Sequence, residues 1–212
     1  MLIYKLTDQN LRTHNGFQYK KNRWITAPNH DPDKSLCSDG WLHAYEHPLI
    51  AVFMNPVHAR IKNPKLFECK WKGNHKKYGQ LKLGVESTIL KKEIGLPTFT
   101  PDELVTIAIN CALLVYDNQY FVDWTNNWLS GTDRSASNAA RSASNAARSV
   151  AWAARSAAWA AESAAATNSA ESAAASSAAE RVAWSAAWSA ARTAWSADFP
   201  LLDIIKNAIG DK

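Results

Sequence analysis

The chain has 212 residues, a formal net charge of +5 and hydrophobic residues at 47% of its positions, and this length suits one or two compact domains. Its three cysteines are widely spaced, which argues against a disulfide framework, and no apolar run is long enough to predict a transmembrane helix. Residue usage is mixed up to Gly131, and alanine and serine then dominate as far as Asp198. We therefore expect a globular head at 1–131, a helical repeat at 132–198 and a short amphipathic tail at 199–212.

Short strand patterns and one short helix are predicted at the start of the chain. Apolar or alternating residues favour strands at Leu2–Lys5, Phe17–Tyr19 and Gly40–Ala44. The segment Pro48–Met54 is typical of a short helix with proline in its first turn. We therefore expect a small mixed α/β head.

The next segment alternates between polar and apolar residues. The alternation from Lys65 to Lys72 predicts a half-buried strand with one apolar side towards the core. Gly73 and Asn74 then supply a turn signal. Further strand candidates follow at 81–85 and 87–90.

A basic run overlaps these strands. Between 60 and 82 the only acid is Glu68, and the residues that we select as a candidate basic patch are Arg60, Lys62, Lys70, Lys72, Lys76 and Lys77. Such a run can contact phosphates or an acidic protein. It can equally be a solvated edge, because lysines on edge strands discourage aggregation. Nucleic acid is therefore an open but not a favoured partner.

Two helices are predicted before the repeat begins. Thr100, Pro101 and Glu103 carry the pattern of a capping box with proline at the first helical position. Apolar residues then recur at helical spacing as far as Tyr116, and a second helix is expected at about 118–129. The second helix has an apolar stripe made of Tyr120, Phe121, Trp124 and Trp128.

The repeat from Arg134 has nearly identical heptads, and alanine is the strongest helix former. Helical spacing separates an alanine flank from a flank of larger side chains. A break near 167–169 predicts two helices. The expected fold class is therefore α+β, with a head followed by a long Ala-rich, coiled-coil-like helical hairpin. One uninterrupted helix stays open as an alternative. The candidate partner-binding residues on the larger flank are Trp152, Trp159, Trp184, Trp188, Trp195, Arg148, Arg155 and Arg192.

Exposed indoles in such numbers mark a contact surface, so we expect something to cover them. The cover could be the head or tail of the same molecule, further copies of the chain, or a foreign partner. Nucleic acid and a membrane surface are among the foreign partners that remain open. A homo-oligomer is the partner that we expect first.

No strong catalytic motif is present. Cys37, His43 and His47 lie close in sequence, but their spacing fits no standard zinc pattern. The chain has no Gly-rich phosphate loop, no nucleophile elbow and no Cys-x-x-Cys pair. We therefore expect no metal site, no cofactor and no catalytic residue, although enzymatic activity of the head stays open.

The stretches Gly16–Tyr19 and Gly40–Ala44 resemble an uncharacterised domain common in tailed bacteriophages and prophages. Members of that family carry a Gly-Phe-Gln-Tyr-like stretch and a later Gly-Phe-His-Ala-like stretch, and often end in variable Ala/Ser/Trp/Arg repeats. The resemblance implies a non-enzymatic, phage-encoded accessory protein that acts through self-assembly or partner binding by the repeat. A host protein is then a candidate partner, and counter-defence is a candidate role. The expected location is the cytoplasm of the infected bacterium, since no signal peptide is evident.

A weaker similarity is to ADP-ribosyltransferase folds. The analogous residues are Tyr4, His43 and Tyr45, but a matching catalytic glutamate is not identifiable. An ADP-ribosyltransferase-like enzyme is therefore the alternative function, and a nucleic-acid-binding protein is the second alternative.

Overall fold

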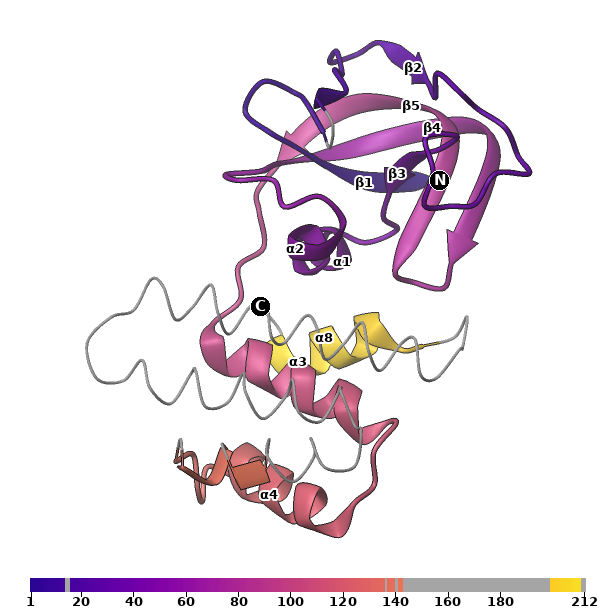
Figure 1. The fold of residues 1–212 in the computed structure, drawn as a ribbon. Coiled ribbons are helices and arrows are strands. Elements are labelled where there is room, and N and C mark those ends of the chain that lie inside the picture. The colour runs from indigo at the N-terminus through magenta and orange to yellow at the C-terminus, as the bar shows by residue number, and fades with distance from the viewer. Residues whose placement is uncertain (14–15, 136, 140, 143–198, 211–212) are drawn as a thin grey trace. The chain divides into compact units, whose positions relative to one another are not determined.

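The computed structural model describes residues 1–13, 16–135, 137–139, 141–142 and 199–210 (Figure 1). The chain divides into two compact units. Unit 1 comprises Met1–Thr98 with Ala197–Leu202, and unit 2 comprises Phe99–Ser196 with Asp203–Lys212. The predicted boundaries of the repeat and the tail remain predictions.

Unit 1 is built on a five-stranded antiparallel sheet. The strands are β1 (Leu2–Thr7), β2 (Trp24–Thr26), β3 (Leu42–Ala44), β4 (Lys65–Tyr78) and β5 (Lys82–Ile94). Two short helices, α1 (Pro48–Phe53) and α2 (Asn55–His58), lie between β3 and β4 in the chain. The long strands β4 and β5 form a hairpin, β1 pairs with β4, and both β2 and β3 pair with β5.

The sheet curls until its first strand meets the residue that follows β3. Tyr4 and Tyr45 exchange two backbone hydrogen bonds, with N–O distances of 2.7 and 2.9 Å. The buried cluster enclosed by this curl is Ile3, Tyr19, Ala27, Leu42, Ala44, Phe67, Cys69, Leu83, Val85 and Leu90. Alternation therefore places Ile3 and Lys5 on the inner face of β1, where apolar residues are expected.

The predicted turn at Gly73–Asn74 is wrong, because β4 continues through it. The β4–β5 register shifts between Lys72 and His75, so Gly73 and Asn74 lie at a bulge instead. Gly73 has a φ of 82°, and an added Cβ would lie only 2.3 Å from Oε2 of Glu86. That same oxygen accepts a hydrogen bond of 2.9 Å from the backbone N of Asn74, which holds the bulge against β5.

Unit 2 contains α3 (Pro101–Leu113) and α4 (Gln119–Leu129), as predicted. The capping box is confirmed, because Thr100 Oγ1 accepts from the Glu103 backbone N at 3.2 Å and Glu103 Oε2 accepts from the Thr100 backbone N at 2.7 Å. In α4, Trp128 is buried with a relative exposure of 2%, whereas Tyr120 is 77% exposed and does not belong to the apolar stripe.

The tail contains α8 (Leu201–Ile209). Its Leu201 and Ile205 are fully buried, and Ile204 is 8% exposed. Within unit 1, the backbone N of Leu202 donates a hydrogen bond of 2.9 Å to Oε1 of Gln80.

The predicted fold class is wrong. Residues 1–94 form an antiparallel sheet with short helices, not a small mixed α/β head. The long Ala-rich hairpin is not among the elements of the described residues, and its candidate contact residues at 148–195 lie outside them. Alanine favours a helix locally but buries little area, so this composition does not by itself specify how two helices would pack.

Candidate functional site

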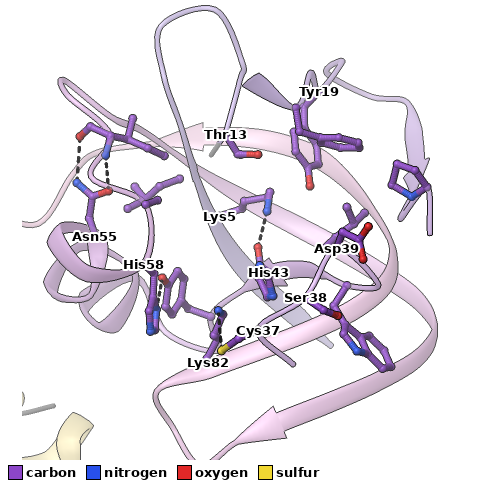
Figure 2. A pocket seen from close by; sticks show the side chains of 18 of the residues that line it. Lys5, Thr13, Tyr19, Cys37, Ser38, Asp39, His43, Asn55, His58 and Lys82 are labelled. Carbon is purple, nitrogen blue, oxygen red and sulfur yellow. Dashed lines mark hydrogen bonds between the residues drawn. The ribbon is translucent and has the colours of Figure 1, made fainter. Parts of the chain in front are cut away.

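A cavity of about 560 Å³ opens on the inner side of the unit 1 sheet (Figure 2). Its volume falls in the range usual for small-molecule sites. The lining comes from β1, β3, β5, the short helix α2 and the loops around 13–19 and 28–41. The residues with polar side chains along it include Lys5, Thr13, Tyr19, Asn29, Cys37, Ser38, Asp39, His43, Tyr45, Asn55, His58 and Lys82.

Lys5 projects into the middle of this cavity from β1 (Figure 2). Its side chain is almost fully buried, its Nζ donates a hydrogen bond to the backbone oxygen of His43, and that Nζ lies 4.8 Å from the ring centroid of Tyr19. Burial lowers the pKa of Lys5 from 10.5 to about 8, with a smaller contribution in the same direction from Lys82. The ammonium is therefore held in the cavity at an electrostatic cost.

Lys82 brings a second ammonium to the same cavity from the start of β5. Its Nζ lies 3.6 Å from Sγ of Cys37, a contact drawn as a dashed line in Figure 2. Within the described part of the chain neither Lys5 nor Lys82 forms a salt bridge with a carboxylate. The lining thus carries two positive charges that the described residues do not neutralise.

The carboxylate of Asp39 also lines the cavity but is engaged with other groups. Its Oδ2 accepts from the side-chain amide of Asn29 at 2.6 Å, and its Oδ1 lies 3.1 Å from Nζ of Lys34. These hydrogen bonds, with that of Asn29 the largest contribution, lower the pKa of Asp39. Asp39 therefore stays ionised at the rim, with Lys34 as its ion-pair partner.

Tyr45 and His58 form a stacked pair on the α2 side of the cavity. Their rings lie 5.9 Å apart at an interplanar angle of 15°, and Tyr45 Oη is 2.9 Å from His58 Nδ1. Burial raises the pKa of Tyr45, and burial with smaller effects of Lys82 and His43 lowers the pKa of His58 to about 3. The phenol is therefore protonated and the imidazole neutral, so the positive charge of the cavity comes from its lysines.

His43 is positioned by the loop that precedes β3. Its Nε2 lies 2.5 Å from the backbone oxygen of Leu36, and its own backbone oxygen accepts from Lys5. Gly84 faces this loop on β5, and a Cβ there would lie 2.4 Å from Cδ1 of Leu36 and 3.0 Å from Cβ of Trp41. A glycine at this point of β5 allows the loop to pack against the strand and keeps His43 in place.

The predicted basic patch does not form one cluster. Lys77 pairs with Glu46 at 2.5 Å, and Nζ of Lys76 donates to the backbone oxygen of Lys34 at 3.1 Å. Arg60 and Lys62 are exposed residues of the segment after α2, at the opposite end of β4 from these contacts. Lys70 and Lys72 are exposed on β4, and Nζ of Lys72 lies 4.7 Å from the ring centroid of Trp24.

Residues singled out for metal or enzyme chemistry are dispersed. Among the described residues no group of three His, Cys, Asp or Glu side chains is arranged to hold a metal ion. Of the ADP-ribosyltransferase-like set, His43 and Tyr45 line the cavity, whereas Tyr4 contacts the ring of His47 at a centroid distance of 6.4 Å and does not line it.

Sequence reasoning missed Lys5, His58 and Lys82 as site residues. Lys82 is the last residue of the basic run and was not distinguished from the other lysines there. His58 lies in a four-residue helix that no sequence pattern predicted. A signal for Lys5 did exist: in the strand Leu2–Thr7 it occupies the same face as Ile3, so a lysine stands at an inward position. A lysine there is costly to bury and therefore marks a site.

One comparison with known proteins found a similarity over the part of the chain that carries this cavity. Residues 1–102 match the family model of a domain of unknown function, DUF7666. No curated protein and no solved structure matches the chain. All residues that line the cavity fall within the matched segment. None of the described helices combines the length and the apolar character needed to cross a lipid bilayer.

Proposed function

We propose that the chain is a non-enzymatic phage accessory protein that acts by binding, and that the cavity of unit 1 binds a small anionic molecule with a flat apolar part. The observation that carries this proposal is the presence of Lys5 and Lys82 in one cavity without a carboxylate partner among the described residues. Buried charge is costly unless it is paired, so an anion that enters the cavity gains two hydrogen-bonding cations.

The aromatic side chains of the lining support a flat group in the ligand. Phe17, Tyr19, Trp41 and Tyr45 line the cavity, and the rings of Phe17 and Tyr19 pack edge to face at 5.2 Å. Aromatic walls bind planar apolar groups through area and ring geometry. The polar groups between these walls then orient the ligand, as in most small-molecule sites.

Calorimetric titration tests this proposal with two probes that differ in charge. We expect naphthalenesulfonate, which joins flat rings to one negative charge, to bind to the full chain at least roughly tenfold more tightly than neutral naphthol, the equivalent of about 1.4 kcal/mol. Lys82→Gln should remove most of this difference, because it replaces the ammonium by an uncharged polar group. The control Lys91→Gln changes an exposed lysine of β5.

Two results would contradict an anion site. One is equal affinity for the charged and the neutral probe. The other is an equal effect of Lys82→Gln and Lys91→Gln, which would assign the affinity to net charge and not to the cavity.

The ADP-ribosyltransferase-like alternative is supported only by the position of His43 and Tyr45 in the cavity. The carboxylate in the lining, Asp39, is bound to Asn29 and Lys34. Release of nicotinamide from NAD by the full chain would favour this alternative over a binding protein. NAD binding without release would favour the binding protein.

The alanine-rich repeat is the segment that we propose for self-association, on the sequence pattern of its indoles and guanidiniums. Replacing Trp184, Trp188 and Trp195 by serine in the full chain is expected to lower the mass in solution from that of an oligomer towards that of a monomer, because large exposed apolar groups drive association. Light scattering measures this mass. The control replaces Tyr120, which is exposed on α4, and an unchanged mass in the tryptophan variant would contradict the proposal.

A further inference from the structure

The register of the sheet places an exposed tryptophan and a lysine in one row on the outer face. Leu2 pairs with Lys70, Lys70 with Ile89, and Ile89 with Trp24, which makes one continuous row across four strands. Paired residues in a sheet project to the same face. Figure 1 shows β2, which carries Trp24, alongside β5. Because side chains alternate, this row lies on the face of β1 opposite to Lys5 and the cavity.

The indole of Trp24 is exposed on this face and touches a cation. Trp24 is 41% exposed and Leu2 42% exposed. Nζ of Lys72 lies 4.7 Å from the centroid of the indole. The flexible stem of a lysine allows this ammonium to move to a phosphate when another ring takes its place on the indole.

Positive charge surrounds the indole. Lys70 and Lys72 are exposed on β4, and the exposed residues directly before Trp24 include Lys20, Lys21 and Arg23. None of these five cations forms a salt bridge among the described residues. The nearby acid Glu68 is opposed in register by Lys92.

Protection of a sheet edge does not explain the lysine at position 70. Lysines discourage aggregation when they lie on an edge strand with unpaired backbone groups. Lys70 lies on a strand that is paired on both sides, with Leu2 of β1 and with Ile89 of β5. Lys70 lies in the same row as Trp24, with Ile89 between them, and Lys72 contacts the indole. Together these positions point to a ligand with negative charge and flat rings.

We propose that the outer face formed by Trp24, Lys70, Lys72 and Arg23 binds single-stranded nucleic acid. A base stacks on the indole, and the cations hold the phosphates on either side. Single strands fit this surface because their bases have free faces for stacking, whereas the bases of a duplex are covered by their neighbours. This inference is independent of the anion cavity, which lies on the inner face.

Fluorescence anisotropy of the full chain with a short labelled oligothymidylate tests the proposal. We expect saturable binding at about 50 mM salt that weakens as salt increases, since phosphate contacts release counterions. Trp24→Leu should weaken binding roughly tenfold, and Trp24→Phe should retain most of the affinity, because phenylalanine stacks and leucine does not. Both variants keep an apolar residue at this position, so a difference between them reports stacking and not folding.

The salt dependence separates specific phosphate contacts from general charge. Lys70→Gln and Lys72→Gln should each lower the slope of log affinity against log salt by roughly 0.7. Lys62→Gln, the matched control at an exposed lysine in the segment between α2 and β4, should leave this slope unchanged. The proposal is overturned if no binding occurs at about 50 mM salt, if Trp24→Leu binds as the natural chain does, or if Lys62→Gln has the same effect as Lys70→Gln.

Discussion

Replacing Lys5 by methionine is expected to raise the free energy of unfolding at pH 7, and this gain should shrink as the pH rises. Lys5 is almost fully buried and forms no salt bridge among the described residues. Its Nζ donates to the backbone oxygen of His43, a bond that the substitution removes. Methionine is close to lysine in length and has no charge to bury.

The sign of this effect follows from the pKa of Lys5. The pKa is lowered from 10.5 in the unfolded chain to about 8 in the folded chain, mainly by burial. Between these two pH values the unfolded state binds more protons, so the natural protein gains stability as the pH rises through this window. A pKa difference of this size corresponds to about 3 kcal/mol, which exceeds the roughly 1 kcal/mol typical of a lost hydrogen bond.

Urea unfolding at pH 7 and at pH values up to about 10.5 measures the prediction. The advantage of Lys5→Met over the natural chain should fall by about 3 kcal/mol across this range. Lys91→Met, at an exposed position of β5, is the control for general effects of lysine removal. An advantage that stays constant with pH would show that Lys5 is not held as a costly ammonium.

Replacing His58 by asparagine is expected to make the protein more resistant to acid. His58 Nδ1 lies 2.9 Å from the hydroxyl of Tyr45, and an asparagine side-chain amide can either donate to this hydroxyl or accept from it. Burial, with smaller effects of Lys82 and His43, lowers the pKa of His58 from 6.5 to about 3. The imidazole is therefore neutral in the folded chain at pH values well above this.

The natural chain loses stability as the pH falls from 6.5 towards 3, because in this window the unfolded state takes up a proton that the folded state excludes. Between pH 7 and pH 4 the natural chain should lose about 3 kcal/mol more than His58→Asn does. Urea unfolding across this range gives the two curves, with His75→Asn, an exposed residue of β4, as the control. Parallel curves for the natural chain and His58→Asn would contradict the prediction.

Local sequence signals correctly predicted several elements. The capping box at Thr100 and Glu103 forms as expected, since its groups lie three residues apart and interact without help from distant parts of the chain. The strand at the start of the chain and the helices α1, α3 and α4 were also predicted. In each case the decisive pattern is contained within one element.

The antiparallel sheet and the cavity could not be predicted in this way. Two strand candidates at 81–85 and 87–90 are one strand, β5, because its pairing with β4 continues through a bulge that depends on Gly73 and Glu86. Lys5 and Lys82 are far apart in the sequence, and only the pairing of β1, β4 and β5 brings them to one cavity. Such non-local contacts leave no periodic signal in a single sequence.

The most direct test of the anion cavity is an NMR titration of the full chain with naphthalenesulfonate, followed through the backbone amides. We expect the shifted amides to cluster at Lys5, His43, Tyr45, His58 and Lys82, and we expect Lys82→Gln to abolish these shifts at the same concentration of probe. Shifts confined to other surfaces, or an unchanged spectrum at saturating probe, would contradict the assignment of this cavity as the binding site.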